Sequence, residues 1–82
     1  MVIDDVKAVI SSTLQLGSRG QNMDASTPLL GAIPELDSMA VVNVIMALEE
    51  HFGISVQDDE IGAANFATLG SLVTFVEQKV NS

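Results

Sequence analysis

The fold is decided by one stretch of the sequence, DSMAVVNVIMALEEHFGI at residues 37–54. An acid and a serine come directly before a long apolar run, and a glycine follows its last aromatic residue. Apolar residues recur at intervals of three and four, which is the period of a helix with a buried face. We therefore predict a helix from Ser38 to Phe52. Gly53 is expected to end it in the left-handed conformation, with Ile54 closing back on the preceding turn.

The apolar residues of this helix fall into two groups when successive side chains are set about 100° apart. The larger group predicts the side that faces the core: Val41, Val44, Ile45, Leu48 and Phe52. The smaller group, which we call the apolar strip, lies roughly 130° away and comprises Met39, Val42 and Met46, with Glu49, Asn43 and Glu50 along its edges. The apolar strip either packs beneath a loop or forms a protein-binding surface with an acidic rim. Its start beside Ser38 favours the binding surface.

Helical periodicity also predicts the beginning and the end of the chain. Residues 2–16 are expected to form an amphipathic helix, with Gly17 just beyond its C-terminus. The acids at 58–60 are expected to open a short third helix that reaches about Ala64. Thr68 is a suitable N-cap for the final helix. The inward stripe of that helix is Leu69, Leu72, Val73, Val76 and Val80.

Residues 17–37 are rich in Gly, Ser, Asn, Asp and Pro and predict a long ordered loop, held to the core by Leu29 and Leu30. A structureless loop of about twenty residues is unusual in a small domain unless it is functional or contains a short turn of helix. The sequence shows no strand pattern and no repeat. We therefore predict a single all-α domain over residues 1–82, a four-helix bundle with three main helices, one short helix and a long first loop.

The composition narrows the functional classes. Eleven acids and three scattered bases give a net charge of -8. The chain therefore lacks the basic patch that binds nucleic acid, and its charge attracts basic protein surfaces instead. The absence of cysteine excludes disulfides, thiolate metal sites and cysteine nucleophiles. No apolar run approaches the roughly 18 residues of a membrane span, and the acidic N-terminus is unlike a signal peptide. We expect a cytoplasmic monomer with no nucleic-acid partner, no membrane span and no metal site.

Ser38 has three interpretations at the start of its helix. As an N-cap it contributes about 1 kcal/mol, although Val41 stands where a capping box needs Glu or Gln. As a nucleophile Ser38 needs a base, but the single histidine, His51, lies roughly 20 Å away along the helix. His51 is better explained as a cation that interacts favourably with the C-terminus of the helix. As a modification site Ser38 could carry a phosphodiester that the helix N-terminus stabilises. The nucleophile is excluded, and the other two interpretations stay open.

The motif Asp37-Ser38-Met39 at the head of a mid-chain helix, followed by MALEEHFGI at residues 46–54, closely resembles the acyl carrier protein family. The resemblance covers nearly the whole chain, including TPLL at residues 27–30 of the loop. It implies an acyl-carrier-like four-helix bundle that is not an enzyme. In that family, 4'-phosphopantetheine is attached to the serine of the motif, here Ser38 with Asp37 before it, and its thiol carries acyl groups as thioesters.

The resemblance also implies partners. These are a phosphopantetheinyl transferase and the acyl-loading and acyl-transferring enzymes, which have basic docking patches. They are expected to contact the helix through the apolar strip and its acidic rim, that is, through Met39, Val42, Met46, Glu49 and Glu50.

The chain departs from the family at one point. Many carriers of fatty-acid synthesis have acids two and five positions after the serine, where this chain has Ala40 and Asn43. With Pro34-Glu35-Leu36 before the motif, the chain looks more like the dedicated carriers of exosortase or exopolysaccharide systems. We expect a stand-alone acyl carrier. The alternatives are an aminoacyl or peptidyl carrier of secondary metabolism, and an acidic helical interaction module in which Ser38 is only a cap.

Overall fold

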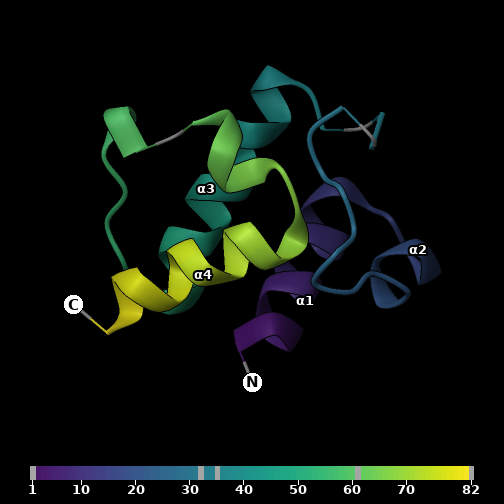
Figure 1. Cartoon of the computed structure of the whole chain (residues 1–82), viewed down its shortest axis with the longest axis horizontal. Helices are drawn as coiled ribbons and strands as arrows, with labels where there is room; N and C mark the ends of the chain where they lie inside the picture. The colour runs from purple at the N-terminus through teal and green to yellow at the C-terminus, as the bar shows by residue number, and fades with distance from the viewer. Residues whose placement is uncertain (1, 32, 35, 61, 82) are drawn as a thin grey trace.

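The computed structural model describes residues 2–31, 33–34, 36–60 and 62–81, whose regular secondary structure is almost entirely helical (Figure 1). The α-helices are α1 (Val2–Leu14), α2 (Ser18–Gln21), α3 (Ser38–Phe52) and α4 (Leu69–Val80). Two 3-10 turns, η1 (Asp58–Glu60) and η2 (Ala63–Phe66), lie in the connection between α3 and α4. Within this described part, the only strand-like pairing is an isolated bridge between Pro28 and Thr68. The all-α prediction is confirmed.

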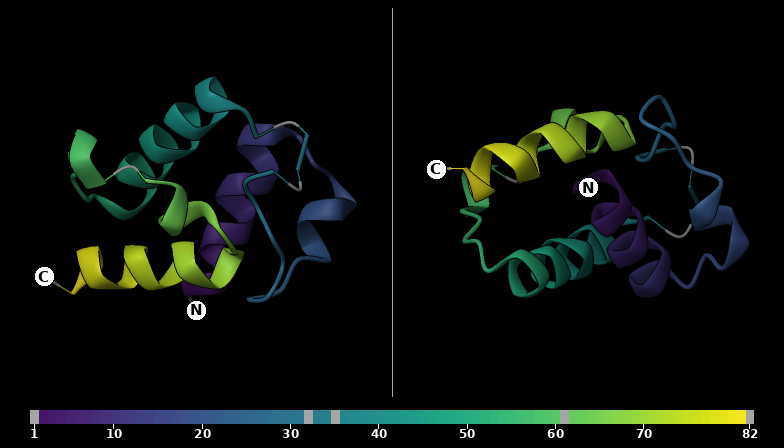
Figure 2. Two further views of the ribbon diagram at one scale, coloured as in Figure 1. Left: turned by 45° about the horizontal axis from the view of Figure 1, so that its top comes forward. Right: turned by 90° about the horizontal axis from the view of Figure 1, so that it is seen from below.

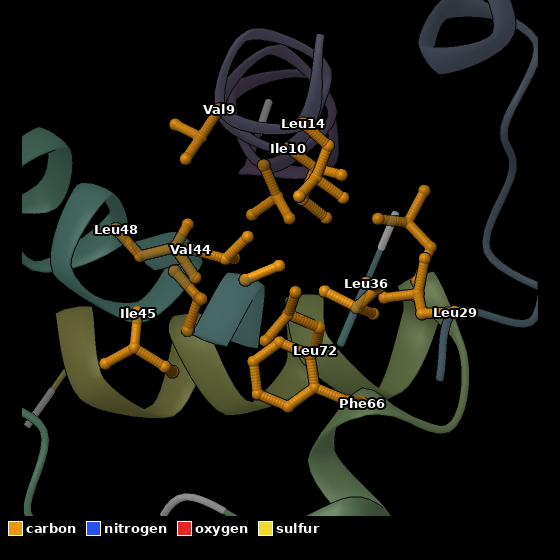
Figure 3. Packing of buried hydrophobic residues seen from close by; sticks show 14 of the residues in the cluster. Val9, Ile10, Leu14, Leu29, Leu36, Val44, Ile45, Leu48, Phe66 and Leu72 are labelled. Atoms are coloured by element: carbon orange, nitrogen blue, oxygen red, sulfur yellow. The ribbon is translucent and has the colours of Figure 1, made fainter. Parts of the chain in front are cut away.

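The helices surround one hydrophobic core. α1 packs against α2, α3 and α4, and both views in Figure 2 show it between them. The three long helices supply most of the fully buried side chains: Val6, Ile10, Val44, Leu48, Leu69, Leu72 and Val76. Figure 3 shows that Leu29 and Leu36 of the long loop and Phe66 of η2 also point into this cluster. The long loop and η2, which connect the helices, therefore contribute side chains to the same core as α3.

α1 ends at Leu14, not at residue 16 as predicted. Gln15 takes the left-handed conformation, with a φ of 56°, and the Leu16 amide donates to the Ser11 carbonyl at 2.9 Å. This is the closing hydrogen bond of a Schellman motif. The turn buries the Leu16 side chain, and that burial offsets the cost of a left-handed residue other than glycine. Gly17 is the N-cap of α2 instead of the C-terminal glycine of α1.

The long loop is ordered by a short helix and by main-chain hydrogen bonds. α2 is the turn of helix that a loop of this length requires. Farther along, four main-chain hydrogen bonds join residues 25–30 to residues 66–70, which lead into α4. Leu29 is fully buried as predicted, but Leu30 is 42% exposed, so the predicted burial of the pair was wrong for Leu30. Neighbouring side chains of an extended backbone point to opposite faces, and only one of the two can enter the core.

Asp24 stabilises the bend that leads into these hydrogen bonds. Its Oδ1 atom accepts from the hydroxyl and the amide of Ser26, at 2.7 and 2.9 Å, and from the hydroxyl of Thr27 at 3.2 Å. Because these donors favour the charged carboxylate, the Ser26 hydroxyl most strongly, they hold the pKa of Asp24 below its usual range. The acid at this position therefore has a structural role.

The short third helix predicted from residue 58 to about Ala64 is replaced by η1 and η2. Gly62 separates them with an extended backbone, at φ -133° and ψ 160°, and glycine is a poor residue for a helix interior. The Asn65 side-chain amide donates to the Glu60 carbonyl at 2.7 Å and so links the two turns. Ile61 of the predicted helix, Glu35 of the Pro34-Glu35-Leu36 segment and the terminal residues 1 and 82 lie outside the described residues.

The start of α4 confirms the predicted cap at Thr68. The Thr68 hydroxyl accepts from the Ser71 amide and the Ser71 hydroxyl accepts from the Thr68 amide, both at 3.1 Å, which makes a capping box. The predicted stripe is buried at Leu69, Leu72 and Val76 and half-buried at Val73. It was wrong at Val80, which is 45% exposed at the last residue of the helix, while Phe75 is buried instead.

Candidate functional site

Asp37, not Ser38, caps α3. Asp37 has an extended backbone at φ -96° and ψ -174°, and its Oδ1 atom accepts a hydrogen bond from the Ala40 amide at 2.8 Å. Its carbonyl accepts the first intrahelical bond, from the Val41 amide at 2.9 Å. The interpretation of Ser38 as the cap is therefore wrong. The sequence held the signal, because Asp is as good an N-cap as Ser and stands one position earlier.

Ser38 is the first residue of α3, and it is exposed. Because Asp37 supplies the cap, the Ser38 hydroxyl has no capping role. No acid occupies the first turn of α3, and the amides and dipole at a helix N-terminus favour an added negative charge. These features fit a phosphodiester on Ser38, since the hydroxyl is open to solvent and the helix end complements the charge.

The core-facing side of α3 is rotated slightly from the predicted one. Val44, Ile45 and Leu48 are buried as predicted, but Val41 and Phe52 are only half-buried. Ala40 is buried, which the periodicity did not predict. Helical periodicity carries no information about which flank of α3 its neighbours cover. Ala40 and Asn43 stand where many fatty-acid carriers have acids, and of these two residues only Asn43 is exposed.

The apolar strip is exposed on α3. Met39 is 69% exposed, Val42 44% and Met46 60%. The alternative that the strip packs beneath the long loop is therefore wrong. Methionine side chains are flexible and polarisable, which suits a surface that adapts to a partner.

The two acids at the edge of the apolar strip have different surroundings. The Oε2 atom of Glu49 accepts a hydrogen bond from the Val56 amide at 2.9 Å. The Glu49 carbonyl accepts from the amides of Gly53 and Ile54, which end the helix with Gly53 in the left-handed conformation as predicted. Glu50, in contrast, is exposed. Glu49 therefore holds the turn after α3, a role that the sequence analysis missed.

His51 lies in the last turn of α3, far from Ser38. Its Nε2 atom is 3.7 Å from Oδ1 of Asp5 in α1, so a protonated imidazole forms an ion pair there. The ring also packs edge-on against Phe52, with 4.9 Å between the centroids. His51 therefore contributes to the contact between α1 and α3, and the exclusion of a serine hydrolase stands.

The described ranges hold no cluster of three or more His, Cys, Asp or Glu side chains that could bind a metal ion. None of the helices formed by residues 2–31, 33–34, 36–60 and 62–81 is long and apolar enough to cross a membrane.

Comparison with known proteins identifies the family. A family model described as the phosphopantetheine attachment site matches residues 4–76. The acyl carrier protein of Sulfurovum sp. (strain NBC37-1) is 38% identical over 77 residues, and the match covers 93% of this chain and 95% of that protein. The acyl carrier protein of Helicobacter acinonychis (strain Sheeba) is 35% identical over 77 residues, covering 93% and 91%.

The fold has a solved counterpart. The holo acyl carrier protein of Nitrosomonas europaea, determined by NMR in solution, is 56% identical and superposes with a TM-score of 0.91 over 98% of this chain and 96% of that one. The predicted acyl-carrier-like bundle is thus confirmed. The chain belongs to the acyl carrier protein family, whose members hold acyl groups on a phosphopantetheine prosthetic group.

Proposed function

We propose that this chain is a stand-alone carrier that holds acyl groups as thioesters on 4'-phosphopantetheine attached to the Ser38 hydroxyl. The observation that carries this proposal is the division of roles at the start of α3, where Asp37 forms the cap and the adjacent Ser38 is exposed. The matched family region, residues 4–76, includes Ser38. A serine that does not cap its helix can be esterified with little effect on the fold.

The chain holds the prosthetic group, and its partner enzymes catalyse the reactions of the acyl group. When bound, phosphopantetheine provides the thiol that forms the thioester. The N-terminus of α3 stabilises the negative charge of the phosphodiester, and Asp37 holds the backbone that presents Ser38. His51 is in the last turn of α3 and cannot act as a base on Ser38.

Partner enzymes have to approach the start of α3. The proposed partners are a phosphopantetheinyl transferase and acyl-loading and acyl-transferring enzymes of the cytoplasm. The net charge of -8 attracts basic surfaces on these enzymes. The apolar strip with Glu50 at its edge is the proposed contact face, because it is exposed and adjoins Ser38. Carriage for an exosortase or exopolysaccharide system stays a prediction, as does the monomeric state.

Loading in vitro tests the attachment. The protein is incubated with coenzyme A and a phosphopantetheinyl transferase, and its intact mass is measured. We expect the wild type to gain one phosphopantetheine and Ser38→Ala to gain none. Ser55→Ala is the matched control, because Ser55 is also exposed but lies outside the motif, and it should be loaded like the wild type. Loading of Ser38→Ala would contradict the site.

A further inference from the structure

Few side chains of this protein are able to attack a thioester. Thiolates, amines and imidazoles are the side-chain groups that do so most readily. The sequence has no cysteine, and its side-chain amines and imidazole are those of Lys7, Lys79 and His51. The position of these three side chains relative to Ser38 therefore matters for a protein that carries a thioester there.

Lys79 lies near the C-terminal end of α3, although it belongs to α4. Its Nζ atom contacts the Glu60 carboxylate, which also accepts a hydrogen bond from the Gln57 amide at 2.9 Å. The preceding amide, that of Val56, donates to the Glu49 carboxylate near the end of α3. Both views in Figure 2 show the end of α4 and the connection after α3 on the same side of the molecule. The Lys79 side chain is 22% exposed and its amine is paired with a carboxylate, so it is also partly shielded.

His51 and Lys7 lie toward the same end of α3. His51 is in the last turn of α3, and its Nε2 atom is 3.7 Å from Oδ1 of Asp5 in α1. Lys7 follows Asp5 in α1, about 3 Å farther along the helix axis. The nucleophilic side chains come from α1, α3 and α4, and the fold gathers them around the C-terminal end of α3.

The opposite end of α3, at Ser38, has an arginine in its surroundings. Ser38 is roughly 20 Å from His51 along the helix axis, and α3 has no ionisable side chain between Ser38 and Leu48. Arg19 lines a groove together with Pro34, and the Cα atoms of Pro34 and Ser38 are at most about 14 Å apart along the chain. An arginine guanidinium stays protonated in proteins and does not attack a thioester.

We propose that this placement protects the acyl cargo, because the amines and the imidazole lie away from Ser38 and the base on its side of the molecule is Arg19. This proposal rests on the proposed attachment to Ser38. In the reaction that is avoided, an unprotonated lysine nitrogen attacks the carbonyl carbon of the thioester. The carbon–nitrogen bond of an amide forms, the carbon–sulfur bond breaks, and the leaving thiolate takes up the proton that the nitrogen loses.

Tethering makes the position of an amine decisive. A group on a short flexible arm has an effective concentration on the order of millimolar at places within its usual reach, and this concentration falls as the required span approaches full extension. An amine near Ser38 therefore meets the thioester far more often than an amine at the other end of α3. Protection of the cargo follows from where the lysines lie as well as from how few there are.

Replacing Arg19 with lysine tests the proposal, because Arg19→Lys keeps the positive charge and adds an amine. The wild type and the variant are loaded from hexanoyl-coenzyme A by a phosphopantetheinyl transferase and kept at mildly alkaline pH. Hydroxylamine then cleaves thioesters but not amides, so the intact mass reports the fraction of acyl group that has moved to nitrogen. We expect this fraction to rise several-fold faster in Arg19→Lys than in the wild type, with the amide located at position 19 by peptide mapping.

Two further lysine variants compare the two ends of the molecule. Gln78→Lys is the matched control, because Gln78 is exposed and adjoins Lys79 in the last turn of α4. It should form no more amide than the wild type. Asn43 is exposed in the first half of α3, and Asn43→Lys should form amide as Arg19→Lys does. Denaturant midpoints should stay close to the wild type, since all three substituted side chains are exposed.

The outcomes separate protection of the cargo from the proposed function. Faster amide formation in Arg19→Lys or Asn43→Lys than in the wild type and Gln78→Lys supports protection by placement. Equal amide formation in all four proteins, or transfer in Gln78→Lys as fast as in the other variants, overturns it while attachment to Ser38 stands. A wild-type protein that gains no acyl-phosphopantetheine overturns the proposed function and this proposal together.

Discussion

The Asp37 carboxylate accepts a hydrogen bond from the Ala40 amide at 2.8 Å. This bond divides two roles between adjacent residues, because Asp37 organises the first turn of α3 and the exposed Ser38 presents a hydroxyl to solvent. If the serine were the cap, esterifying its hydroxyl would disturb an acceptor that the helix needs. The observed arrangement allows the helix to stay intact when Ser38 is modified.

Substitutions of Asp37 and Ser38 test which of the two residues caps α3. Asp37→Ala should lower the free energy of unfolding by about 0.5–2 kcal/mol, because an amide at the start of α3 loses its acceptor. Asp37→Asn keeps an acceptor oxygen and should retain most of the stability. Ser38→Ala should change stability by less than about 0.5 kcal/mol. Urea denaturation measures all three, and a larger loss in Ser38→Ala than in Asp37→Ala would show that the serine is the cap.

The two sides of α3 should separate stability from function. Ile45 is 4% exposed, and Ile45→Ala should cost about 2–5 kcal/mol through lost burial and a residual cavity. The neighbouring Met46 is 60% exposed, and Met46→Ala should cost less than about 0.5 kcal/mol while lowering the transferase kcat/KM. Equal destabilisation of both variants with normal loading would place Met46 in the core.

The contact between Glu60 and Lys79 should make stability depend on pH. The hydrogen bond from Lys79, followed by that from the Gln57 amide, holds the pKa of Glu60 below its ordinary value of 4.5. A carboxyl with a lowered folded-state pKa stabilises the fold above its unfolded-state pKa, and this contribution is lost as the pH falls through the folded-state pKa. The wild type should therefore be more stable than Glu60→Gln at neutral pH.

The difference between these two proteins should shrink below about pH 4.5. Comparing them removes the effect of general repulsion among the acids, which changes with pH in both. Thermal melts over a pH series measure the difference. A difference that is constant across the series would show that Glu60 acts through packing or polarity alone.

Close packing between the long loop and α4 predicts the effect of a glycine substitution. A Cβ atom at Gly70 would lie 2.8 Å from the carbonyl oxygen of Ala25, which itself accepts the Gly70 amide. Gly70→Ala should therefore destabilise the protein by about 1–3 kcal/mol, although alanine is the better helix former. Gly62→Ala is the control, because a Cβ there meets no atom within 4 Å. Chemical denaturation of both tests the contact, and a stabilised Gly70→Ala would contradict it.

Sequence periodicity predicted the long helices because each of them buries one face, so that apolar residues recur with the period of the helix. α3 begins and ends as predicted, and the Thr68 cap of α4 is correct. The errors lie where tertiary contacts decide. Burial of Leu16 ends α1 at a left-handed Gln15, a residue that gives no local signal for this conformation.

The sequence predicted the exposure of the apolar strip in the candidate site, but not the hydrogen bonds around it. The angular separation of the two apolar groups on α3 left the apolar strip either exposed or beneath the loop, its start beside Ser38 favoured exposure, and its exposure is confirmed. Periodicity could not show that Glu49 bonds to the Val56 amide, because that bond depends on the path of the chain after α3. It could not show the burial of Ala40 either, since that burial depends on how neighbouring segments pack against α3.

Site-resolved mass spectrometry of the loaded protein tests directly whether Ser38 carries the prosthetic group. After incubation with the transferase and coenzyme A, the protein is digested and the peptide that contains residues 37–39 is fragmented. We expect one phosphopantetheine on this peptide, with fragment ions that assign it to Ser38, and an unmodified peptide from Ser38→Ala. Phosphopantetheine on any other residue, or a wild-type peptide that stays unmodified under conditions that load another acyl carrier protein, would contradict the attachment to Ser38.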